Sequence, residues 1–203
     1  MSDALRPSDA ELYSSFLGGE TTSYDQLMVR YGDSLTFFLF GYLHDWEEAE
    51  DLMIEAFARI MAKRPRIAEG AFKAYLFRTG RNLALRSIDR RRRIVMFSVD
   101  GMDKEAAETY MAREAGAASD ADGIPEMLVR DEEAKILRKC LERIEPELRE
   151  ALWLVYMEQM TYAQTAKVMG VKEKRVDRLL TRGKQQMRKE LEKEGITNEN
   201  RHL

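Results

Sequence analysis

The residues best suited to chemistry in this chain are the basic side chains between Thr161 and Glu190. Ala166 and Gly170 stand at the spacing that lets two short helices cross closely and turn, and Val176 can hold the second helix on the first. The pattern predicts a helix-turn-helix whose second helix presents a basic face to the major groove of duplex DNA. The residues predicted to contact this DNA are Lys172, Lys174, Arg175, Arg178, Arg182 and Lys184. An ordinary helical hairpin with a solvated basic face is the alternative.

A second basic segment, residues 72–93, reads FKAYLFRTGRNLALRSIDRRRR. Side chains four residues apart share one face of a helix, so this segment predicts an exposed arginine-rich stripe. Arginines contact phosphates, and the amide of Asn82 can hydrogen-bond the edge of an unpaired base. The residues predicted to contact nucleic acid are Arg78, Arg81, Asn82, Arg86, Arg90 and Arg91. Phe72 and Tyr75 are predicted to lie in the core, and a solvated helix end is the alternative for the arginine run.

Carboxylates gather on the helix that precedes this segment, opposite an apolar face with a regular helical period. Asp45 can cap that helix, and Glu48 stands three residues later, where it can complete a capping box. The acidic face has no His or Cys beside it and lacks the ligand arrangement that a metal needs. We therefore expect a protein-docking surface, with a solvated face as the alternative. The predicted docking residues are Glu47, Glu50, Asp51, Leu52 and Glu55.

An enzyme is not expected from the remaining reactive side chains. His44 and His202 are isolated, and Cys140 is the single cysteine, at a position compatible with a helical core. No Gly-rich phosphate loop or nucleophile motif accompanies them. The sequence therefore predicts no catalytic residue, no metal site and no cofactor.

Charge and composition agree with a binding protein of the cytosol. The 203 residues carry a formal net charge of −3, but residues 59–93 hold twelve basic and two acidic side chains, whereas residues 98–133 hold three basic and eleven acidic ones. Two basic blocks separated by an acidic one suggest two contacts with a polyanion. No apolar run approaches the ~18 residues of a membrane span. A single cysteine cannot form an internal disulfide, which suits a reducing compartment.

The elements that must position these residues are helices throughout. Apolar spacing predicts helices near residues 24–43, 45–64, 70–90, 130–144 and 146–157, followed by the helix-turn-helix. The expected fold is all-α, with two small helical domains joined by a flexible acidic linker. The predicted divisions are an N-terminal tail (1–23), a first domain (24–97), the linker (98–128), a second domain (129–193) and a C-terminal tail (194–203).

The order of these features resembles the extracytoplasmic-function (group 4) sigma factors of bacterial RNA polymerase. The likeness covers about residues 24–93 and 130–192. The docking helix of that family is similar to EAEDLMIEAFARIMAK, and its −10 segment is similar to residues 72–93. Its −35-reading region matches LERIEPELREALWLVYMEQMTYAQTAKVMGVKEKRVDRLLTRGKQQMRKEL.

The resemblance implies a division of labour among the residues named above. It implies that the docking residues face the clamp helices of the polymerase largest subunit, and that the C-terminal domain meets the flap region. The arginine-rich segment would recognise and melt the −10 element, with Asn82 near a flipped-out base. The helix-turn-helix would read the −35 element. An anti-sigma factor, no membrane contact of its own and a bacterial cytoplasmic location are implied as well.

Four positions depart from the family pattern, and one other function remains open. Ile54 stands where the family often has Gln, and Arg175 where Thr is usual. Gln164 replaces a frequent Glu, and Asp177 replaces a frequent basic residue. The alternative is a free-standing transcriptional regulator that binds an operator through its helix-turn-helix, with residues 1–93 as a sensing or dimerising domain. The arginine-rich helix and the acidic docking face argue against it, because a sensor domain needs neither.

Overall fold

The protein divides into two compact units, residues 1–123 and residues 124–203. The computed structural model describes residues 6–99, 136 and 139–196, with the side chains of residues 95 and 97–99 left out. Every regular element in these ranges is a helix, which confirms the all-α prediction. The predicted linker, residues 98–128, lies almost wholly outside the described residues, as do residues 197–203 of the predicted C-terminal tail.

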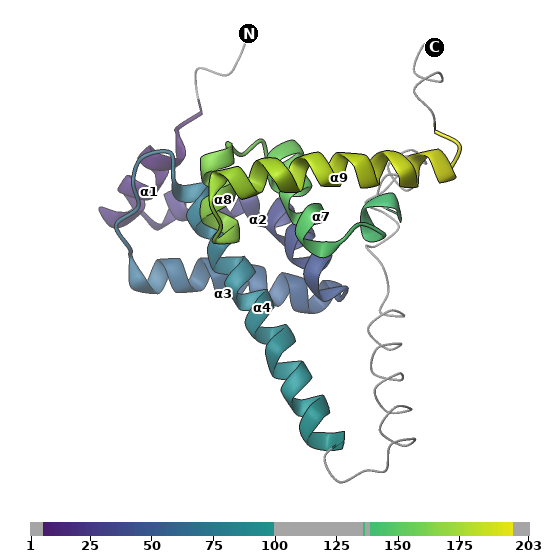
Figure 1. Ribbon diagram of the computed structural model, residues 1–203. Coiled ribbons are helices and arrows are strands. Elements are labelled where there is room, and N and C mark those ends of the chain that lie inside the picture. The colour runs from purple at the N-terminus through teal and green to yellow at the C-terminus, as the bar shows by residue number, and fades with distance from the viewer. Residues whose placement is uncertain (1–5, 100–135, 137–138, 197–203) are drawn as a thin grey trace. The chain divides into compact units, whose positions relative to one another are not determined.

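The first unit consists of four helices, α1 (Asp9–Leu17), α2 (Thr21–Leu43), α3 (Trp46–Lys63) and α4 (Phe72–Val99). Helix α2 packs against the other three and forms the centre of the unit (Figure 1). Aromatic rings fill much of the core that they enclose. The largest side chains with less than 2% exposure in this unit are Phe16, Phe57, Phe77, Leu27, Leu35, Leu39, Ile60 and Leu76.

Helix α1 corrects the expectation that residues 1–23 form a tail. Ser8 begins the helix with a complete capping box, in which its hydroxyl accepts from the backbone N–H of Glu11 and the Glu11 carboxylate accepts from the backbone N–H of Ser8. Three side chains of α1 are buried because they share the face that packs on α2 and α4. They are Leu12, Tyr13 and Phe16.

Helix α3 begins and ends where the sequence indicates. The Asp45 side chain accepts from the backbone N–H of Glu48, and the helix ends at Lys63, followed by Arg64 in the left-handed region with φ 43° and then by Pro65. Only half of the expected capping box forms. Glu48 turns instead toward α4, where its carboxylate accepts from the hydroxyl of Ser87.

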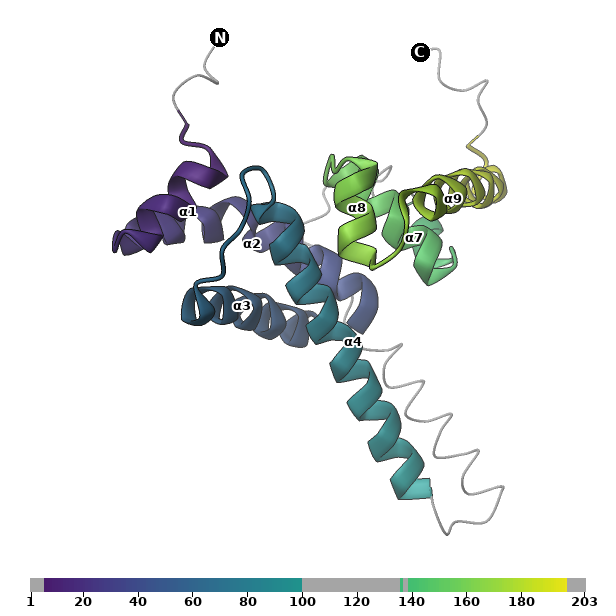
Figure 2. The ribbon, with the colours of Figure 1, turned by 60° about the vertical axis from the view of Figure 1, so that its left-hand side comes forward.

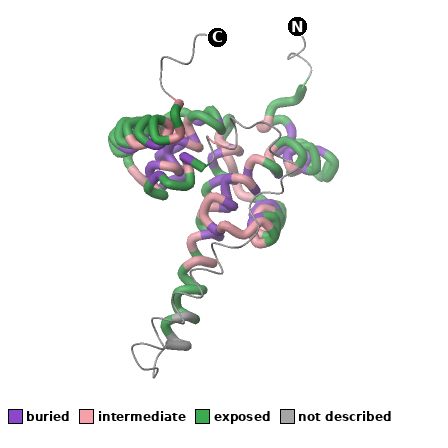
Figure 3. Tube along the Cα trace, turned by 90° about the vertical axis from the view of Figure 1, so that its right-hand side faces the viewer, coloured by how far each residue is buried: buried purple, intermediate pink, exposed green. Residues whose placement is uncertain are grey.

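Helix α4 is longer than the sequence predicts, because it continues past residue 90 to Val99. Its first turns are seated in the core through Phe72, Leu76 and Phe77. Every described side chain from Asp89 onward is exposed, so the helix projects from the body of its unit (Figure 3). The second half of α4 thus carries the arginine run away from the core of its unit.

The second unit is built from α7 (Pro146–Leu152), the π-helix η2 (Trp153–Met157), α8 (Tyr162–Met169) and α9 (Glu173–Lys193) (Figure 2). The expected single helix over 146–157 therefore changes to π geometry in its second half. Helix α9 packs against both α7 and α8.

The predicted helix-turn-helix is confirmed between α8 and α9. Thr161 and Gln164 form a complete capping box at the start of α8, and Gly170 ends it with φ 69°, a conformation that favours glycine. Farther along α9, a Cβ on Gly183 would lie 3.1 Å from Leu152 Cγ. Glycine therefore lets α9 approach α7 closely.

No helix among the described residues combines the length and apolar character needed to cross a membrane.

Candidate nucleic-acid and protein interfaces

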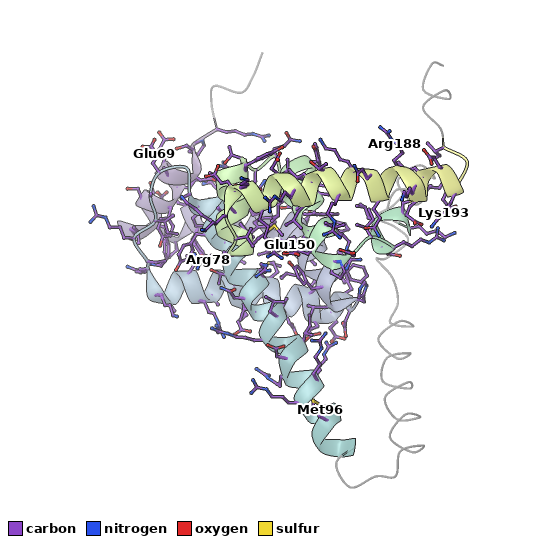
Figure 4. The ribbon with its side chains drawn as sticks, viewed as in Figure 1. Glu69, Arg78, Met96, Glu150, Arg188 and Lys193 are labelled. Carbon is purple, nitrogen blue, oxygen red and sulfur yellow. The ribbon has the colours of Figure 1, made fainter. Side chains whose placement is uncertain are left out.

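The exposed side of α4 carries the arginine stripe that the sequence predicts. Arg78, Asn82, Arg86 and Arg90 are exposed at four-residue intervals, on one side of the helix (Figure 4 labels Arg78). None of these four side chains has a hydrogen bond or ion pair with another residue of the described ranges. Their charges and the Asn82 amide are available to a ligand, while Gly80 lies within the unit against α2.

Two other residues of this predicted set lie differently. Arg81 is half-buried beside the stripe. Arg91 pairs with Glu48 of α3, the same carboxylate that accepts from Ser87. The pair ties the docking helix to the arginine helix at the level where α4 leaves the core, so Arg91 has a structural contact that the sequence did not reveal.

Tyr75 was expected in the core, and the structure corrects this. Its side chain is 38% exposed, whereas its neighbours Phe72 and Phe77 are buried. Tyr75 precedes Arg78 by three residues and Asn82 by seven, so it continues the exposed stripe. An exposed ring beside arginines and an amide can stack on an unpaired base. The spacing from Arg78 was the signal in the sequence that could have identified it.

The acidic face of α3 is present as predicted. Glu47, Glu50 and Asp51 are exposed, and Leu52 is half-buried behind them. Glu55 is half-buried and accepts two hydrogen bonds from Arg59, at 2.9 and 2.6 Å. Among the described residues no group of three or more acidic, histidine or cysteine side chains is arranged to hold a metal ion.

The same face of α3 has an apolar half that sequence analysis missed. Ile54 is 53% exposed, and Met61 is 47% exposed. Glu47, Asp51, Ile54, Ala58 and Met61 follow one another at alternating steps of four and three residues. This is the spacing with which a helix packs along a coiled coil. The face can therefore receive a helical partner over its whole length.

The six basic residues predicted on the helix-turn-helix are all exposed. Val176, Leu179 and Leu180 are buried beneath them and hold α9 in place, as the sequence predicts for Val176. The residues opposite this buried face also include Thr181 and Gln185, which the sequence analysis did not single out. Polar side chains at such positions can hydrogen-bond base edges in a major groove.

The six basic side chains differ in their surroundings. The side chains of Lys172, Lys174 and Arg178 have no hydrogen bond or ion pair with other described residues. Arg175 donates to both carboxylate oxygens of Glu147, at 2.7 and 2.9 Å, and this carboxylate raises the pKa of the Arg175 guanidinium. The other two contacts are Arg182 with Glu145 at 3.2 Å and Lys184 over the ring of Tyr156 at 5.2 Å.

Comparison with known families matches each of the two units to a separate family model. Sigma-70 region 2 matches residues 27–94, and sigma-70 region 4 matches residues 134–187. These spans contain α3 and α4 in the first unit, and the helix-turn-helix in the second. The chain belongs to the extracytoplasmic-function sigma factors of the sigma-70 family.

Two relatives carry sigma-factor names. The "ECF RNA polymerase sigma factor SigE" of Mycolicibacterium smegmatis is 31% identical over 176 residues, which cover 84% of this chain and 62% of SigE. The "RNA polymerase sigma-H factor" of Pseudomonas aeruginosa is 25% identical over 162 residues, covering 79% of this chain and 82% of that protein. This chain thus spans about three-fifths of the length of SigE and about four-fifths of sigma-H.

Solved structures share the fold. The sigma factor RpoE of Bartonella quintana, in complex with the anti-sigma factor NepR, has a TM-score of 0.65 and 20% identity, over 83% of this chain and 96% of RpoE. CnrH, in complex with the cytosolic domain of CnrY, has a TM-score of 0.60 and 19% identity, over 92% of this chain and 98% of CnrH.

Proposed function

We propose that this protein is an alternative sigma factor, a non-enzymatic subunit that binds core RNA polymerase and directs it to promoters with particular −35 and −10 elements. The observation that carries the proposal is the occurrence of regions 2 and 4 in order on two compact units, each with an exposed basic helix. The protein would act in the bacterial cytoplasm, where RNA polymerase and the chromosome are found.

Helix α3 is the proposed contact with the clamp helices of the polymerase largest subunit. Glu47, Glu50 and Asp51 would meet basic side chains, and Leu52 and Glu55 would flank them. Ile54 and Met61 extend the contact because both are large, apolar and half-exposed. The coiled-coil spacing of this face suits a helical hairpin as the partner.

Helix α4 is the proposed −10 reader. Arg78, Arg86 and Arg90 would neutralise phosphates, while Asn82 hydrogen-bonds an unpaired base and Tyr75 stacks against one. Arg81 and Arg91 would lie at the border of this contact, with Arg91 held by Glu48.

Helix α9 is the proposed −35 reader. Two of its basic residues, Lys174 and Arg178, have no side-chain partner among the described residues and lie opposite the buried face, where a recognition helix meets base edges. Lys172, Arg175, Arg182 and Lys184 would contact phosphates on either side. The second unit would also meet the polymerase flap region. An anti-sigma factor is a further proposed partner, since the fold is shared with the sigma factor RpoE, which was solved in complex with the anti-sigma factor NepR.

Run-off transcription with core bacterial RNA polymerase on a library of promoter fragments tests this function. We expect new transcripts from discrete sites that share −35 and −10 elements, and none without the protein. A free-standing regulator would instead give no transcript, no co-elution with core enzyme and tight binding to duplex DNA alone.

Two substitutions test the division of labour. Asp51→Arg reverses a charge on the docking face and should weaken association with core polymerase by about tenfold or more, measured by co-elution or anisotropy. Arg178→Ala should weaken −35-dependent initiation by roughly five- to a hundredfold and leave core affinity unchanged. Loss of core-polymerase binding in Arg178→Ala would contradict the proposal that α9 binds DNA and α3 binds the polymerase. Unchanged affinity for core polymerase in Asp51→Arg would mean that the carboxylates of α3 are only a solvated face.

A further inference from the structure

One flank of α9 is already occupied by carboxylates of the same unit. Arg175, Arg182 and Gln186 follow one another at steps of seven and four residues, so they share one side of the helix. All three meet the segment that begins α7. Arg175 pairs with Glu147 at 2.7 Å, Arg182 pairs with Glu145 at 3.2 Å, and Gln186 accepts from the backbone N–H of Glu145 at 3.4 Å.

The two carboxylates stand on either side of Pro146, at the first turn of α7. One guanidinium nitrogen of Arg175, Nη2, donates to both oxygens of Glu147, and Nη2 of Arg182 donates to the carboxylate of Glu145. The carboxylates thus occupy one nitrogen of each arginine that could otherwise donate to a DNA phosphate.

The pairs are also accessible and weak enough to exchange. The side chains of Arg175 and Arg182 are 58% and 61% exposed, and those of Glu147 and Glu145 are 42% and 56% exposed. Lys174 and Arg178, on the outer side of α9, have no such partner among the described residues. Helix α9 therefore has one side with unpaired basic side chains, Lys174 and Arg178, and a neighbouring side where Arg175 and Arg182 are paired with glutamates.

We propose that Glu145 and Glu147 act as internal substitutes for DNA phosphates, which hold Arg175 and Arg182 until duplex DNA displaces them. Binding of DNA by α9 is then an exchange of carboxylate for phosphate at two arginines. This inference rests on the proposed function, in which α9 is the −35 reader. It makes the two glutamates determinants of −35 affinity although neither contacts DNA.

The exchange has a signature in the dependence of affinity on salt. Each phosphate that a protein neutralises releases about 0.9 counterions from DNA. A glutamate that loses its arginine takes up cation from solution, which offsets that release. Glutamine takes up no cation, so replacing the glutamate by glutamine should raise both the affinity for DNA and the dependence of that affinity on salt.

The test compares Glu147→Gln, Glu145→Gln and the double variant in the full-length chain. Glu173→Gln is the matched control, because Glu173 begins α9, is exposed and has no ion pair among the described residues. It removes the same charge two residues from Arg175 without releasing an arginine. Thermal unfolding is measured alongside, so that a loss of folding is recognised.

Binding is measured by fluorescence anisotropy with a duplex of arbitrary sequence, at several salt concentrations. We expect Glu145→Gln and Glu147→Gln each to bind DNA about two- to fivefold more tightly than the Glu173→Gln control at low salt. The gain in affinity of the double variant should be about the product of the two single gains. The slope of log K against log salt should steepen by up to about one for each glutamate replaced.

Affinity equal to that of Glu173→Gln would overturn the proposal, because only overall charge would then matter. Weaker binding in a folded variant would also overturn it, because the glutamates would then position the arginines for DNA. The arbitrary duplex separates this inference from the proposed function. If run-off transcription fails for the wild type while the variants still bind duplex more tightly, the sigma-factor role fails and the exchange stands.

Discussion

Helices α4 and α9 both carry exposed arginines, but they are held by their units in different ways. Helix α9 is anchored by the buried side chains of Val176, Leu179 and Leu180, and it packs against α7 and α8. Farther along, Gly183 lies against Leu152 of α7, and buried Glu190 pairs with Arg143. Helix α4 is buried only through its first half, Ser87 and Arg91 then join it to Glu48 of α3, and its described side chains from Asp89 onward are exposed (Figure 3). One basic helix is thus fixed along its length, and the other is a rod fixed at one end.

The difference fits the two kinds of nucleic acid that the helices are proposed to bind. Reading base edges in a duplex needs side chains fixed to within a fraction of an ångström, which a fully anchored helix such as α9 provides. Phosphates and unstacked bases tolerate more freedom in their binding residues. A projecting α4 with unpaired Arg78, Arg86 and Arg90 offers strong charge with little positional constraint.

The largest expected effect comes from removing the anchor of each helix. Phe77 is completely buried on α4, with its ring 5.3 Å from that of Phe38, and Leu180 is 2% exposed on α9. Phe77→Ala should lower the free energy of unfolding of the first unit by about 3–5 kcal/mol, and Leu180→Ala that of the second by about 2–5 kcal/mol. Calorimetry of the full chain measures both transitions.

Each substitution is the control for the other. Because the two units are separately compact, each variant should shift one transition and leave the other in place. A shift of both transitions by one substitution would show that the units unfold together, and the comparison of two independently anchored helices would fail.

The elements that sequence analysis located well are those with local signals. Asp45 predicted the start of α3, and Gly170 predicted the turn of the helix-turn-helix, because caps and turns depend on neighbouring residues. Helix α1 was missed, although Ser8 and Glu11 have capping-box spacing. Its nine residues are too few for a convincing period, and it is stable because Tyr13 and Phe16 pack on the rest of the unit.

The candidate sites were predicted as lists of residue types but not as sets of contacts. The exposed basic residues of α4 and α9 follow from helical period alone. The pairs Arg91–Glu48 and Arg175–Glu147 join residues 43 and 28 positions apart. Such pairs depend on how helices cross, which no local pattern reports. Tyr75 was misplaced because an aromatic ring next to buried residues has the composition of a core.

A smaller effect tests whether each basic helix depends on a close approach to a neighbouring helix of its own unit, α4 to α2 and α9 to α7. A Cβ on Gly80 would lie 3.0 Å from Leu35 Cδ1, and one on Gly183 would lie 3.1 Å from Leu152 Cγ. Overpacking costs about 1–3 kcal/mol, against a gain of about 1 kcal/mol in helix propensity. We therefore expect Gly80→Ala and Gly183→Ala each to lower the free energy of unfolding of its own unit by about 1 kcal/mol.

Gly41→Ala is the control for these two substitutions. Gly41 lies in α2, and a Cβ there would have no atom within 4 Å among those considered around it. It should gain about 0.5–1 kcal/mol, because only the helix propensity changes. Chemical denaturation measures all three. A gain in stability for Gly183→Ala as large as that for Gly41→Ala would mean that α9 does not need the close approach to α7.

The smallest expected change in stability comes from the capping boxes, which differ between the two units. Ser8 is paired with Glu11 in the first unit, and Thr161 with Gln164 in the second. Ser8→Ala and Thr161→Ala should each cost about 0.5–2 kcal/mol, but only the first box can titrate. Hydrogen bonds from the backbone N–H and the hydroxyl of Ser8 lower the pKa of Glu11 from its usual 4.5.

The lowered pKa determines how the stability of each unit depends on pH. The folded state favours ionised Glu11, so this contribution is complete above pH 4.5 and is lost as the pH falls through the lower pKa of the folded state. Glu11→Gln should therefore flatten the acid side of the stability curve of the first unit, whereas Gln164→Glu should introduce such a dependence into the second. Thermal unfolding from pH 6 to pH 3, followed for each transition, measures both effects. An acid dependence unaltered by Glu11→Gln would mean that other carboxylates dominate this range and that the cap of α1 makes little difference to its unit.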